Sequence, residues 1–400
     1  MTQHIVKNSL SIIIPAYNEE SAISSTVNRC LQAAAKLKDT QGLEQIEIIV
    51  VNDGSTDRTP DIVAEISGVR LLSFPENFGY GAAIKYGFSQ SSGEYLGFLD
   101  GDGTCDPEFF KPMLELLLAS SADLVTGCRM HNQSKMPIVR RVGNFLYARM
   151  ISVLTGFKVK DTASGMRVIR RSSLPELYPL PDGLHFTPAM TCRALMKDRM
   201  VLKEIDMPYH ERQGISKLSV VKDGLRFLLA ILDISLTYRP LKVFGRIAMT
   251  FLVIALLYGI NPLYNKLVYN SLSEGSIYRL LTINTLILAG MTLLSIGIVA
   301  ERIALSLNGS NRDYSIFERT LLFLFSVRKM MVAGPFLILL GVLLNIGPIL
   351  DYLTTLQISY HWGYISTGAL LVLAGLQLSA LGVFERLIET IVQESKNSVQ

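Results

Sequence analysis

The sequence predicts an α/β domain built on a mostly parallel sheet, followed by a region of transmembrane helices. Short apolar runs alternate with amphipathic stretches between residues 10 and 130, the pattern of a sheet with helices on both faces. The apolar content of the 400-residue chain is high, at 49% with a mean hydropathy of +0.34. Almost all of the excess of apolar residues lies after residue 240, so the two parts of the chain differ in composition.

Five apolar runs in the first part are expected to be strands, and several are apolar throughout, as in strands covered on both faces. The runs are 11–17, 46–52, 69–74, 95–99 and 122–126. Two helix starts, Thr59-Pro60-Asp61 and Asp106-Pro107-Glu108, each place a capping residue before a proline and an acidic first turn. The alternation predicts a doubly wound sheet, in which ligands bind at the carboxyl ends of the strands.

Polar clusters follow three of the predicted strands. They read Pro15-Ala-Tyr-Asn-Glu-Glu20, Asn52-Asp-Gly-Ser-Thr-Asp57 and Asp100-Gly101-Asp102. Because the carboxyl ends of parallel strands share one edge of a sheet, these clusters are expected to lie together. Tyr17 is suited to stacking on a base, and Asp53 to accepting a hydrogen bond from a base or ribose. The two carboxylates of the third cluster suit Mg²⁺ or Mn²⁺, which also bind substrate phosphates.

These blocks resemble the family 2 glycosyltransferases, which have the GT-A fold. The matching blocks are Ser11-Ile-Ile-Ile-Pro-Ala-Tyr-Asn-Glu-Glu20, Val51-Asn-Asp-Gly-Ser-Thr-Asp57, Asn77-Phe-Gly-Tyr-Gly-Ala-Ala83 and Asp100-Gly-Asp102. Asn52 replaces the first aspartate of the family's usual Asp-Asp-Gly-Ser, which leaves the base-binding role to Asp53. The resemblance implies a nucleotide-sugar donor and a metal held by Asp100 and Asp102, with Thr104 contributing directly or through water. The expected donor-binding residues are Pro15, Ala16, Tyr17, Glu19, Asp53, Asp100, Gly101, Asp102, Arg212 and Lys217.

The next part of the chain resembles the polyprenyl-phosphate sugar transferases, the group of dolichol-phosphate mannosyltransferase. The blocks that carry this resemblance are Thr126-Gly-Cys-Arg129, Arg140-Arg-Val-Gly-Asn144, Asp161-Thr-Ala-Ser-Gly-Met-Arg167 and Arg212-Gln-Gly-Ile-Ser-Lys-Leu218. The resemblance implies that a hexose passes from a nucleotide sugar to polyprenyl or dolichyl phosphate. GDP-mannose and UDP-glucose stay open as alternative donors.

Six basic residues between the metal motif and the first apolar segment are expected to lie outside the strands. They are Arg129, Arg140, Arg141, Arg167, Arg212 and Lys217. Arginine binds phosphate through two parallel hydrogen bonds and stays charged, so the first four are expected to hold the lipid phosphate. Asp161 could pair with one of these arginines and orient it. Surface charge that meets anionic headgroups is the alternative interpretation of each basic residue.

A phosphate acceptor is already an anion near neutral pH, so its attack needs positioning and charge neutralisation rather than a general base. None of the five histidines lies in a motif that suggests a base. The expected reaction is an in-line attack of the lipid phosphate oxygen on C1 of the sugar, with inversion. Asp100, Asp102, Arg129 and Arg212 are the expected catalytic residues, and the metal would neutralise charge on the departing nucleotide diphosphate.

Four apolar segments of about 20 residues follow Pro240, each long enough to cross a bilayer. They are expected at 241–260, 280–300, 330–350 and 363–384. The middle connection is rich in arginine and the outer ones are poor in it, so the positive-inside rule places that loop and both termini in the cytoplasm. The polar first ten residues indicate no cleavable signal peptide. The expected organisation is a catalytic domain at 1–215, an interfacial amphipathic helix at 216–240 and a membrane region at 241–400.

Other classes of function fit the sequence less well. The net charge of +4 and the lack of an arginine-rich helix argue against nucleic acid as a partner. The four cysteines show no zinc spacing and are expected to be reduced thiols. A processive polysaccharide synthase would carry a Gln-x-x-Arg-Trp motif, whereas the single tryptophan is Trp362, after Tyr360 and His361. A non-enzymatic transporter or scaffold is the other alternative, and uncharged span interiors argue against it.

Overall fold

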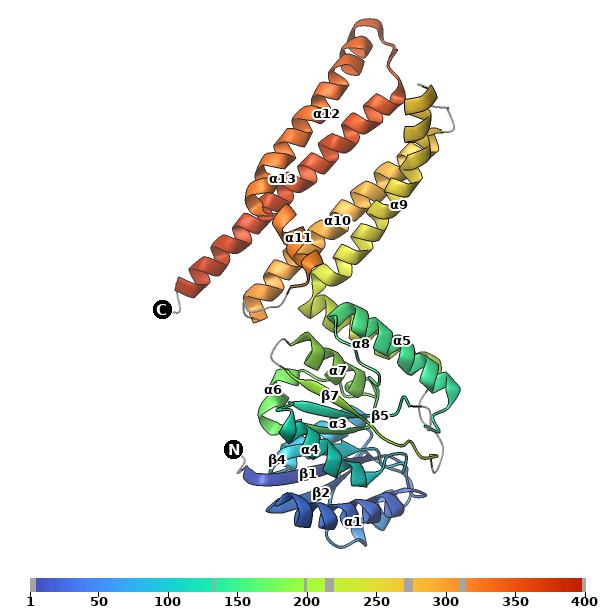
Figure 1. Ribbon diagram of the computed structural model, residues 1–400, viewed down its shortest axis with the longest axis vertical. Coiled ribbons are helices and arrows are strands. Elements are labelled where there is room, and N and C mark those ends of the chain that lie inside the picture. The colour runs from blue at the N-terminus through green and yellow to red at the C-terminus, as the bar shows by residue number, and fades with distance from the viewer. Residues whose placement is uncertain are drawn as a thin grey trace. The chain divides into compact units, whose positions relative to one another are not determined.

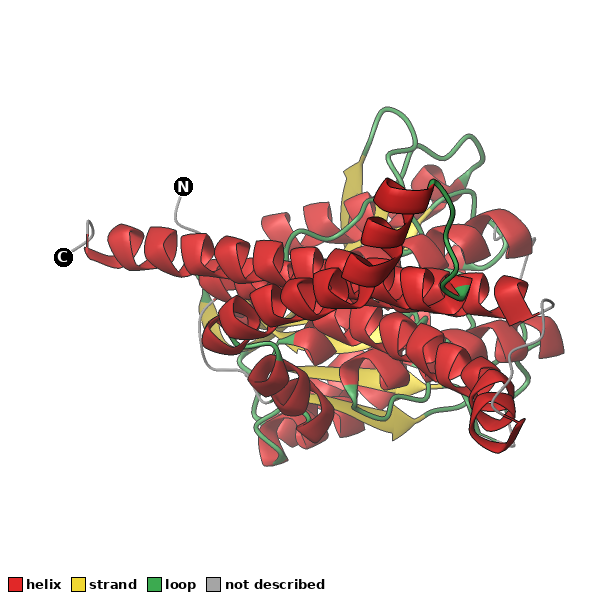
Figure 2. Ribbon diagram, turned by 90° about the horizontal axis from the view of Figure 1, so that it is seen from above, coloured by secondary structure: helices red, strands yellow, loops and turns green. Residues whose placement is uncertain are grey.

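The computed structural model describes residues 5–131, 134–197, 200–212, 219–269, 276–308 and 314–397. The chain divides into two compact units, Met1–Ser235 and Leu236–Gln400. All of the described strands, drawn in yellow in Figure 2, belong to the first unit.

The first unit is a three-layer α/β structure (Figure 1). Its elements, in chain order, are β1 (Val6–Ala16), α1 (Ile23–Gln41), β2 (Gln45–Asn52), α2 (Thr59–Ala64), β3 (Arg70–Ser73), α3 (Tyr80–Gln90), β4 (Gly93–Leu99), η1 (Pro107–Phe109), α4 (Phe110–Ala119), β5 (Leu124–Cys128), α5 (Ile138–Thr155), β6 (Met166–Arg170), η2 (Arg171–Ser173), α6 (Leu174–Leu177), α7 (Phe186–Met196), β7 (Leu202–Asp206) and α8 (Val220–Tyr238). The five predicted strands are present, and β6 and β7 are additional.

The sheet has the strand order β3-β2-β1-β4-β6-β5-β7. Its neighbouring pairs are parallel except at β6, which is antiparallel to both β4 and β5. The predicted mostly parallel sheet is therefore confirmed. Because β6 runs against the other strands, its first residue lies at the edge where they end, and Met166 pairs with Leu99. This reversal brings the loop before β6 to the side of Asp100.

Apolar side chains fill both sides of the sheet. On one face, Ile12 and Ile14 of β1 join a buried cluster with α1 and α4, including Ile23 and Phe110. On the opposite face, Phe98 of β4 contacts Phe88 of α3 and Phe186 of α7, with ring centroids 6.2 and 6.0 Å apart. Strands buried on both faces explain why these runs are apolar throughout.

The two predicted helix starts differ in outcome. Asp106 caps η1 as expected, since its side chain accepts a hydrogen bond from the Glu108 N–H at 3.2 Å. Thr59 is the first helical residue of α2 rather than its cap, and Arg58 occupies the cap position. The carboxylate of Asp57 accepts the Thr59 N–H at 3.0 Å instead. The Asp57 side chain thus satisfies the first N–H of the helix, although no side chain caps α2.

The second unit is helical in its described part. It contains α9 (Pro240–Tyr269), α10 (Ser276–Asn308), α11 (Ile316–Leu324), α12 (Val327–Thr355) and α13 (Trp362–Asn397). Four of these helices, α9, α10, α12 and α13, are long and apolar enough to cross a membrane. They contain the four segments predicted from the sequence, and each extends beyond the predicted bounds; in α13 the extension includes charged residues such as Glu385 and Arg386.

Polar contacts join the two helical hairpins of the second unit. Asn284 of α10 donates to Ser366 of α13 at 2.6 Å, and Gln377 of α13 donates to Thr292 of α10 at 2.9 Å. Within the second hairpin, Gly334 of α12 packs directly on α13. Small residues and interhelical hydrogen bonds are the usual means by which membrane helices associate.

Candidate active site

A cavity of about 580 Å³ opens in the first unit at the sheet edge where β1, β2 and β4 end. The residues after these strands, Tyr17, Asp53 and Asp100, all line it. The predicted meeting of three polar clusters at one edge is thus present in the structure. The predicted site residues that line the cavity are Pro15, Ala16, Tyr17, Glu19, Asp53, Asp100, Gly101, Asp102, Thr104, Arg129, Arg140 and Arg212.

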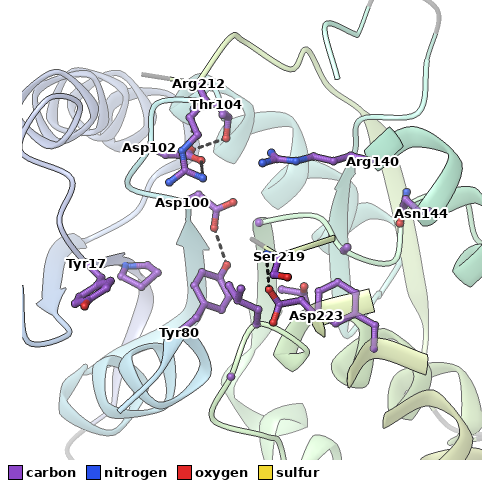
Figure 3. Close-up of a pocket in the computed structure, with 18 of the residues that line it drawn as sticks. Tyr17, Tyr80, Asp100, Asp102, Thr104, Arg140, Asn144, Arg212, Ser219 and Asp223 are labelled. Atoms are coloured by element: carbon purple, nitrogen blue, oxygen red, sulfur yellow. Dashed lines mark hydrogen bonds and ion pairs between the residues drawn. The ribbon is translucent and has the colours of Figure 1, made fainter. Parts of the chain in front are cut away.

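The two carboxylates of the Asp100-Gly101-Asp102 turn are each held by a hydroxyl group (Figure 3). The Tyr80 hydroxyl donates to Asp100 Oδ1 at 2.7 Å, and the Thr104 hydroxyl donates to Asp102 Oδ1 at 2.6 Å. The Thr104 N–H also donates to Asp102 Oδ1, at 3.1 Å. These contacts restrict both side chains before any ligand binds.

The carboxyl group of Asp100 is a weaker acid than an ordinary aspartate. Burial, followed by the charge of Asp102, raises the pKa of its carboxyl from 3.8 to about 7, against the opposing effects of Tyr80, Arg129 and Arg212. Two carboxylates forced close together in a partly desolvated site repel each other, and a divalent cation relieves that repulsion.

Arg212 bridges two carboxylates at the cavity. Its guanidinium lies 2.7 Å from Glu19 Oε1 through Nη2 and 3.3 Å from Asp102 Oδ2 through Nη1. Glu19 is itself positioned by its backbone N–H, which donates to the Thr59 hydroxyl at 2.8 Å. The arginine therefore joins the turn after β1 to the carboxylate turn after β4, where a diphosphate between them would meet its charge.

Asp53, after β2, is also ordered by backbone contacts. Asp53 accepts hydrogen bonds from the Phe78 N–H at 2.8 Å and the Gly79 N–H at 3.0 Å. Burial raises the pKa of Asp53, and these two hydrogen bonds partly offset that effect. Asn52 does not line the cavity, and its side-chain oxygen accepts the Ser55 N–H at 3.0 Å. The replacement of the family's aspartate by Asn52 thus preserves the turn and leaves Asp53 at the cavity.

Arg129 also lines the cavity, and it has a buried partner. Its Nε and Nη2 donate to the two oxygens of Asp161 at 2.8 and 3.0 Å, and its backbone N–H donates to the same carboxylate at 2.9 Å. Burial alone would raise the pKa of Asp161, but Arg129 more than offsets this and holds it below the usual value. The expectation that Asp161 orients an arginine is confirmed. Arg140, on α5, donates to the Tyr209 hydroxyl at 3.3 Å.

Not every predicted phosphate-binding residue reaches the cavity. Arg167 is fully buried in β6, where it donates to the carbonyls of Ser164 and Thr162 at 3.3 and 2.9 Å. The prediction that Arg167 lies outside the strands is therefore wrong, and among the described residues its Nε and Nη2 donate to the backbone of the loop before β6 rather than lining the cavity. Arg141 donates to the His131 carbonyl at 2.7 Å and does not line the cavity. Lys217 lies outside the described residues.

The cavity also contains residues that the sequence did not single out. Tyr80, Tyr209 and Gly165 line it, together with Asp223 of α8. Tyr80 and Gly165 fall inside the motif blocks at 77–83 and 161–167, so the blocks signal their importance but not their contacts. Tyr209 falls in no block.

Gly165 allows the Asp100 carboxylate to occupy its place. A Cβ atom at position 165 would overlap the Asp100 side chain, which Tyr80 holds from the other side. We expect Gly165→Ala to displace this carboxylate and to lower the catalytic rate about 100-fold, the scale of a misplacement near 1 Å. The measurement is the turnover number of the purified full-length chain, beside its unfolding midpoint.

The control for this variant is Gly259→Ala in α9, where the nearest atom to an added Cβ is 3.8 Å away, on Ile283. It should retain the activity of the unmodified chain. Equal turnover in the Gly165→Ala chain would contradict the packing of Gly165 on Asp100.

The carboxylate pair fits a divalent cation. Among the described residues, no group of three or more His, Cys, Asp or Glu side chains gathers to hold an ion by itself. Mg²⁺ and Mn²⁺ suit one or two carboxylates supplemented by water and substrate phosphate oxygens. Asp100 and Asp102 meet that requirement with hard oxygen atoms facing a cavity. The Thr104 hydroxyl lies beside this pair and donates to Asp102 Oδ1.

Comparisons with known proteins show which sequences this chain resembles. The model of the family described as glycosyl transferase family 2 matches residues 11–178. A dolichyl-phosphate hexose transferase of Haloferax volcanii is 30% identical over 233 residues, which cover 58% of this chain and 96% of that protein. The low-salt glycan biosynthesis hexosyltransferase Agl6 of the same organism is 34% identical over 229 residues. That match covers 55% of this chain and 53% of Agl6, so the chain spans about half the length of this relative.

One solved structure is similar to part of this chain. Glucosyl-3-phosphoglycerate synthase from Mycobacterium tuberculosis, determined with Mn²⁺, UDP and glucosyl-3-phosphoglycerate, covers 57% of this chain and 80% of its own. The TM-score is 0.46 and the sequence identity is 20%.

Proposed function

The chain belongs to glycosyl transferase family 2, and from this premise we propose that it transfers a hexose from a nucleotide sugar to a polyprenyl or dolichyl phosphate. The observation that carries the proposal is a single cavity lined by two sets of charged side chains. One set is the carboxylates Asp100 and Asp102, and the other, which we call the acceptor wall, is the guanidinium groups of Arg129 and Arg140. A metal-bound diphosphate suits the first set and a phosphate acceptor suits the second.

The donor is placed by the residues after β1, β2 and β4. Tyr17 and Asp53 form the base and ribose side, and Arg212 meets the diphosphate beside Asp102. GDP-mannose and UDP-glucose are the two donors that we propose to test first. Asp100 and Asp102 would hold Mg²⁺ or Mn²⁺, which would supply charge neutralisation for the departing nucleotide diphosphate.

The acceptor phosphate needs no general base because it is already an anion near neutral pH. Arg129 is rigid, since Asp161 holds its Nε and Nη2 together with its backbone N–H. A fixed guanidinium aligns the phosphate oxygen with C1 of the sugar without reorganisation during the reaction. We propose an in-line attack with inversion, in which the new bond forms from the phosphate oxygen as the bond to the diphosphate breaks.

Two helices of the first unit offer apolar surface for the lipid. On α5, Ile138 is 78% exposed and Phe145 is 58% exposed, and on α8 Val221 is 82% exposed. Tyr147 of α5 links the two helices, because its hydroxyl donates to the Gly224 carbonyl of α8 at 2.9 Å. Helices with one apolar and one basic side are typical of a membrane interface. The expected interfacial helix at 216–240 thus has a neighbour in α5.

The four long helices of the second unit support a membrane-bound enzyme. The arginine-rich middle connection favours a cytoplasmic position for it and for both termini, by the positive-inside rule. In this orientation the first unit would meet soluble nucleotide sugars and the phosphate of a lipid in the inner leaflet.

The test of the function is a transfer assay. Membranes that contain the full chain are incubated with labelled GDP-mannose or UDP-glucose and with polyprenyl phosphate, with and without Mn²⁺. Label in a chloroform-soluble product that carries a single sugar is the expected result. Label only in an insoluble polymer, or no lipid-linked label with any donor, would contradict the proposal.

The acidity of Asp100 leads to a pH prediction for this assay. An ion binds the ionised carboxylate and competes with its proton, and the pKa of Asp100 is about 7. We expect the Mn²⁺ concentration for half-maximal transfer to rise about tenfold for each pH unit below this value and to stay level above it. Mn²⁺ titrations on both sides of pH 7 measure this. A half-maximal concentration that is the same on both sides would show that Asp100 does not bind the ion.

A further inference from the structure

The segment that follows β7 is held by backbone contacts to the end of β5 and to the loop after β4. The Met207 N–H donates to the Cys128 carbonyl at the end of β5 at 2.9 Å, and the His210 N–H donates to the Thr104 carbonyl at 3.0 Å. Two residues later, Arg212 reaches Glu19 and Asp102. The backbone is therefore anchored on both sides of Tyr209, which fixes where the side chain of this residue can go.

Tyr209 lies between the two arginines of the acceptor wall. It is only 6% exposed and lines the cavity. Its hydroxyl oxygen accepts from Arg140 Nη1 at 3.3 Å, and the Arg129 guanidinium carbon lies 5.8 Å from its ring centroid. Tyr209 thus contacts Arg129 through the face of its ring and Arg140 through its hydroxyl group.

The hydroxyl proton of Tyr209 has no acceptor among the described residues. A guanidinium group contains no acceptor atom, so neither Arg129 nor Arg140 can accept a hydrogen bond from the Tyr209 hydroxyl. A buried hydroxyl group normally donates to some partner, because leaving it unpaired costs free energy. The partner is expected in the cavity, and it must be an acceptor that tolerates two guanidinium groups beside it. An anionic oxygen meets this condition.

We propose that Tyr209 is a third phosphate-binding residue, whose hydroxyl donates to an oxygen of the polyprenyl phosphate while it orients Arg140. This inference rests on the proposed function and extends it. A phosphate monoester has three terminal oxygens, and Arg129, Arg140 and Tyr209 offer three donors from one wall. Tyr209 keeps its proton throughout the reaction, because the acceptor is already ionised and no proton has to move.

The experiment replaces the hydroxyl and keeps the ring. Tyr209→Phe is made in the full-length chain and assayed with the better acceptor of dolichyl and undecaprenyl phosphate. The loss of one hydrogen bond to a charged group corresponds to a change of about tenfold in affinity. We expect the KM for the lipid phosphate to rise about tenfold, and the KM for the nucleotide sugar to stay within about twofold of the unmodified value.

Tyr95→Phe is the matched control. Tyr95 in β4 is also 6% exposed and also lies beside an arginine, with the Arg170 carbon 5.9 Å from its ring centroid, but it does not line the cavity. It should leave both KM values unchanged. A selective effect on one substrate is the readout that a merely structural role of Tyr209 would not produce.

Two outcomes would overturn the inference. The first is an unchanged KM for the lipid phosphate in the Tyr209→Phe chain. The second is an equal rise for both substrates, or an equal rise in the Tyr95→Phe chain. A failure of the proposed function looks different, because the unmodified chain would then form no lipid-linked sugar with any donor. A readout without turnover is the ratio of the affinities for undecaprenyl phosphate and undecaprenol, measured by equilibrium binding. In the Tyr209→Phe chain this ratio should fall about tenfold.

Discussion

Asp102→Asn is expected to lower transfer to polyprenyl phosphate by at least about 100-fold, the scale on which removal of transition-state charge stabilisation acts. The substitution keeps the size of the side chain, so Thr104 and Arg212 still pack beside it. It removes one of the two carboxylates that would hold the metal behind the leaving diphosphate. It also removes one of the two ion pairs of Arg212, which keeps the other with Glu19 at 2.7 Å.

The measurement is the rate of lipid-linked product formation at saturating Mn²⁺ in full-length protein with an unchanged unfolding midpoint. Asp106→Asn is the matched control from the same loop. Asp106 caps η1 and does not line the cavity, and asparagine caps as well as aspartate. Full activity of the Asp102→Asn chain would remove this residue from the metal site. A comparable loss in the Asp106→Asn chain would instead indicate a general disturbance of the loop.

Asp161→Asn is expected to lower the free energy of unfolding of the first unit by about 3–5 kcal/mol, because it leaves the charge of Arg129 buried without compensation. Asp161 is fully buried, and three of the hydrogen bonds that it accepts come from Arg129. The asparagine amide would bring N–H donors against the donors of the guanidinium. For a domain of this size the expected fall in the unfolding midpoint is on the order of 10 °C.

Thermal unfolding of the detergent-solubilised full chain measures this effect. The control is Glu176→Gln, which removes an exposed ion pair with Lys197 at 2.9 Å and should cost less than about 1 kcal/mol. Removing both charges of the buried pair, in the double variant Asp161→Asn with Arg129→Met, should recover part of the lost stability. An Asp161→Asn chain as stable as the Glu176→Gln chain would contradict a structural role for the buried pair.

Local patterns in the sequence were sufficient for much of the fold. Apolar runs of strand length predicted β1 to β5, because the residues of a doubly covered strand must be apolar whatever their neighbours are. The four long helices were predictable for a similar reason, since a span needs about 20 apolar residues in a row. The exact bounds differ, because helices continue past the apolar core where nothing in the sequence stops them.

The short strands β6 and β7 escaped prediction. β6 reads Met-Arg-Val-Ile-Arg, in which two of five residues are charged, and such a segment shows no apolar run. Its place in the sheet depends on pairing with β4 and β5, which lie far away in the chain. The error about Arg167 follows directly, because a guanidinium that looks exposed in the sequence is buried by this pairing.

The sequence by itself determined the class of this protein, the edge at which its site lies and the carboxylates at that edge. It could do so because strand ends, motif blocks and apolar spans are local properties of the chain. The tertiary structure alone decided which basic residues face the cavity and which partners hold Asp100 and Arg129. The contacts of Tyr80, Gly165 and Tyr209 join residues that are far apart in the sequence. They form only when β6 pairs in the sheet and the segment after β7 packs at the cavity. Those contacts depend on long-range packing, which no local pattern of residues encodes.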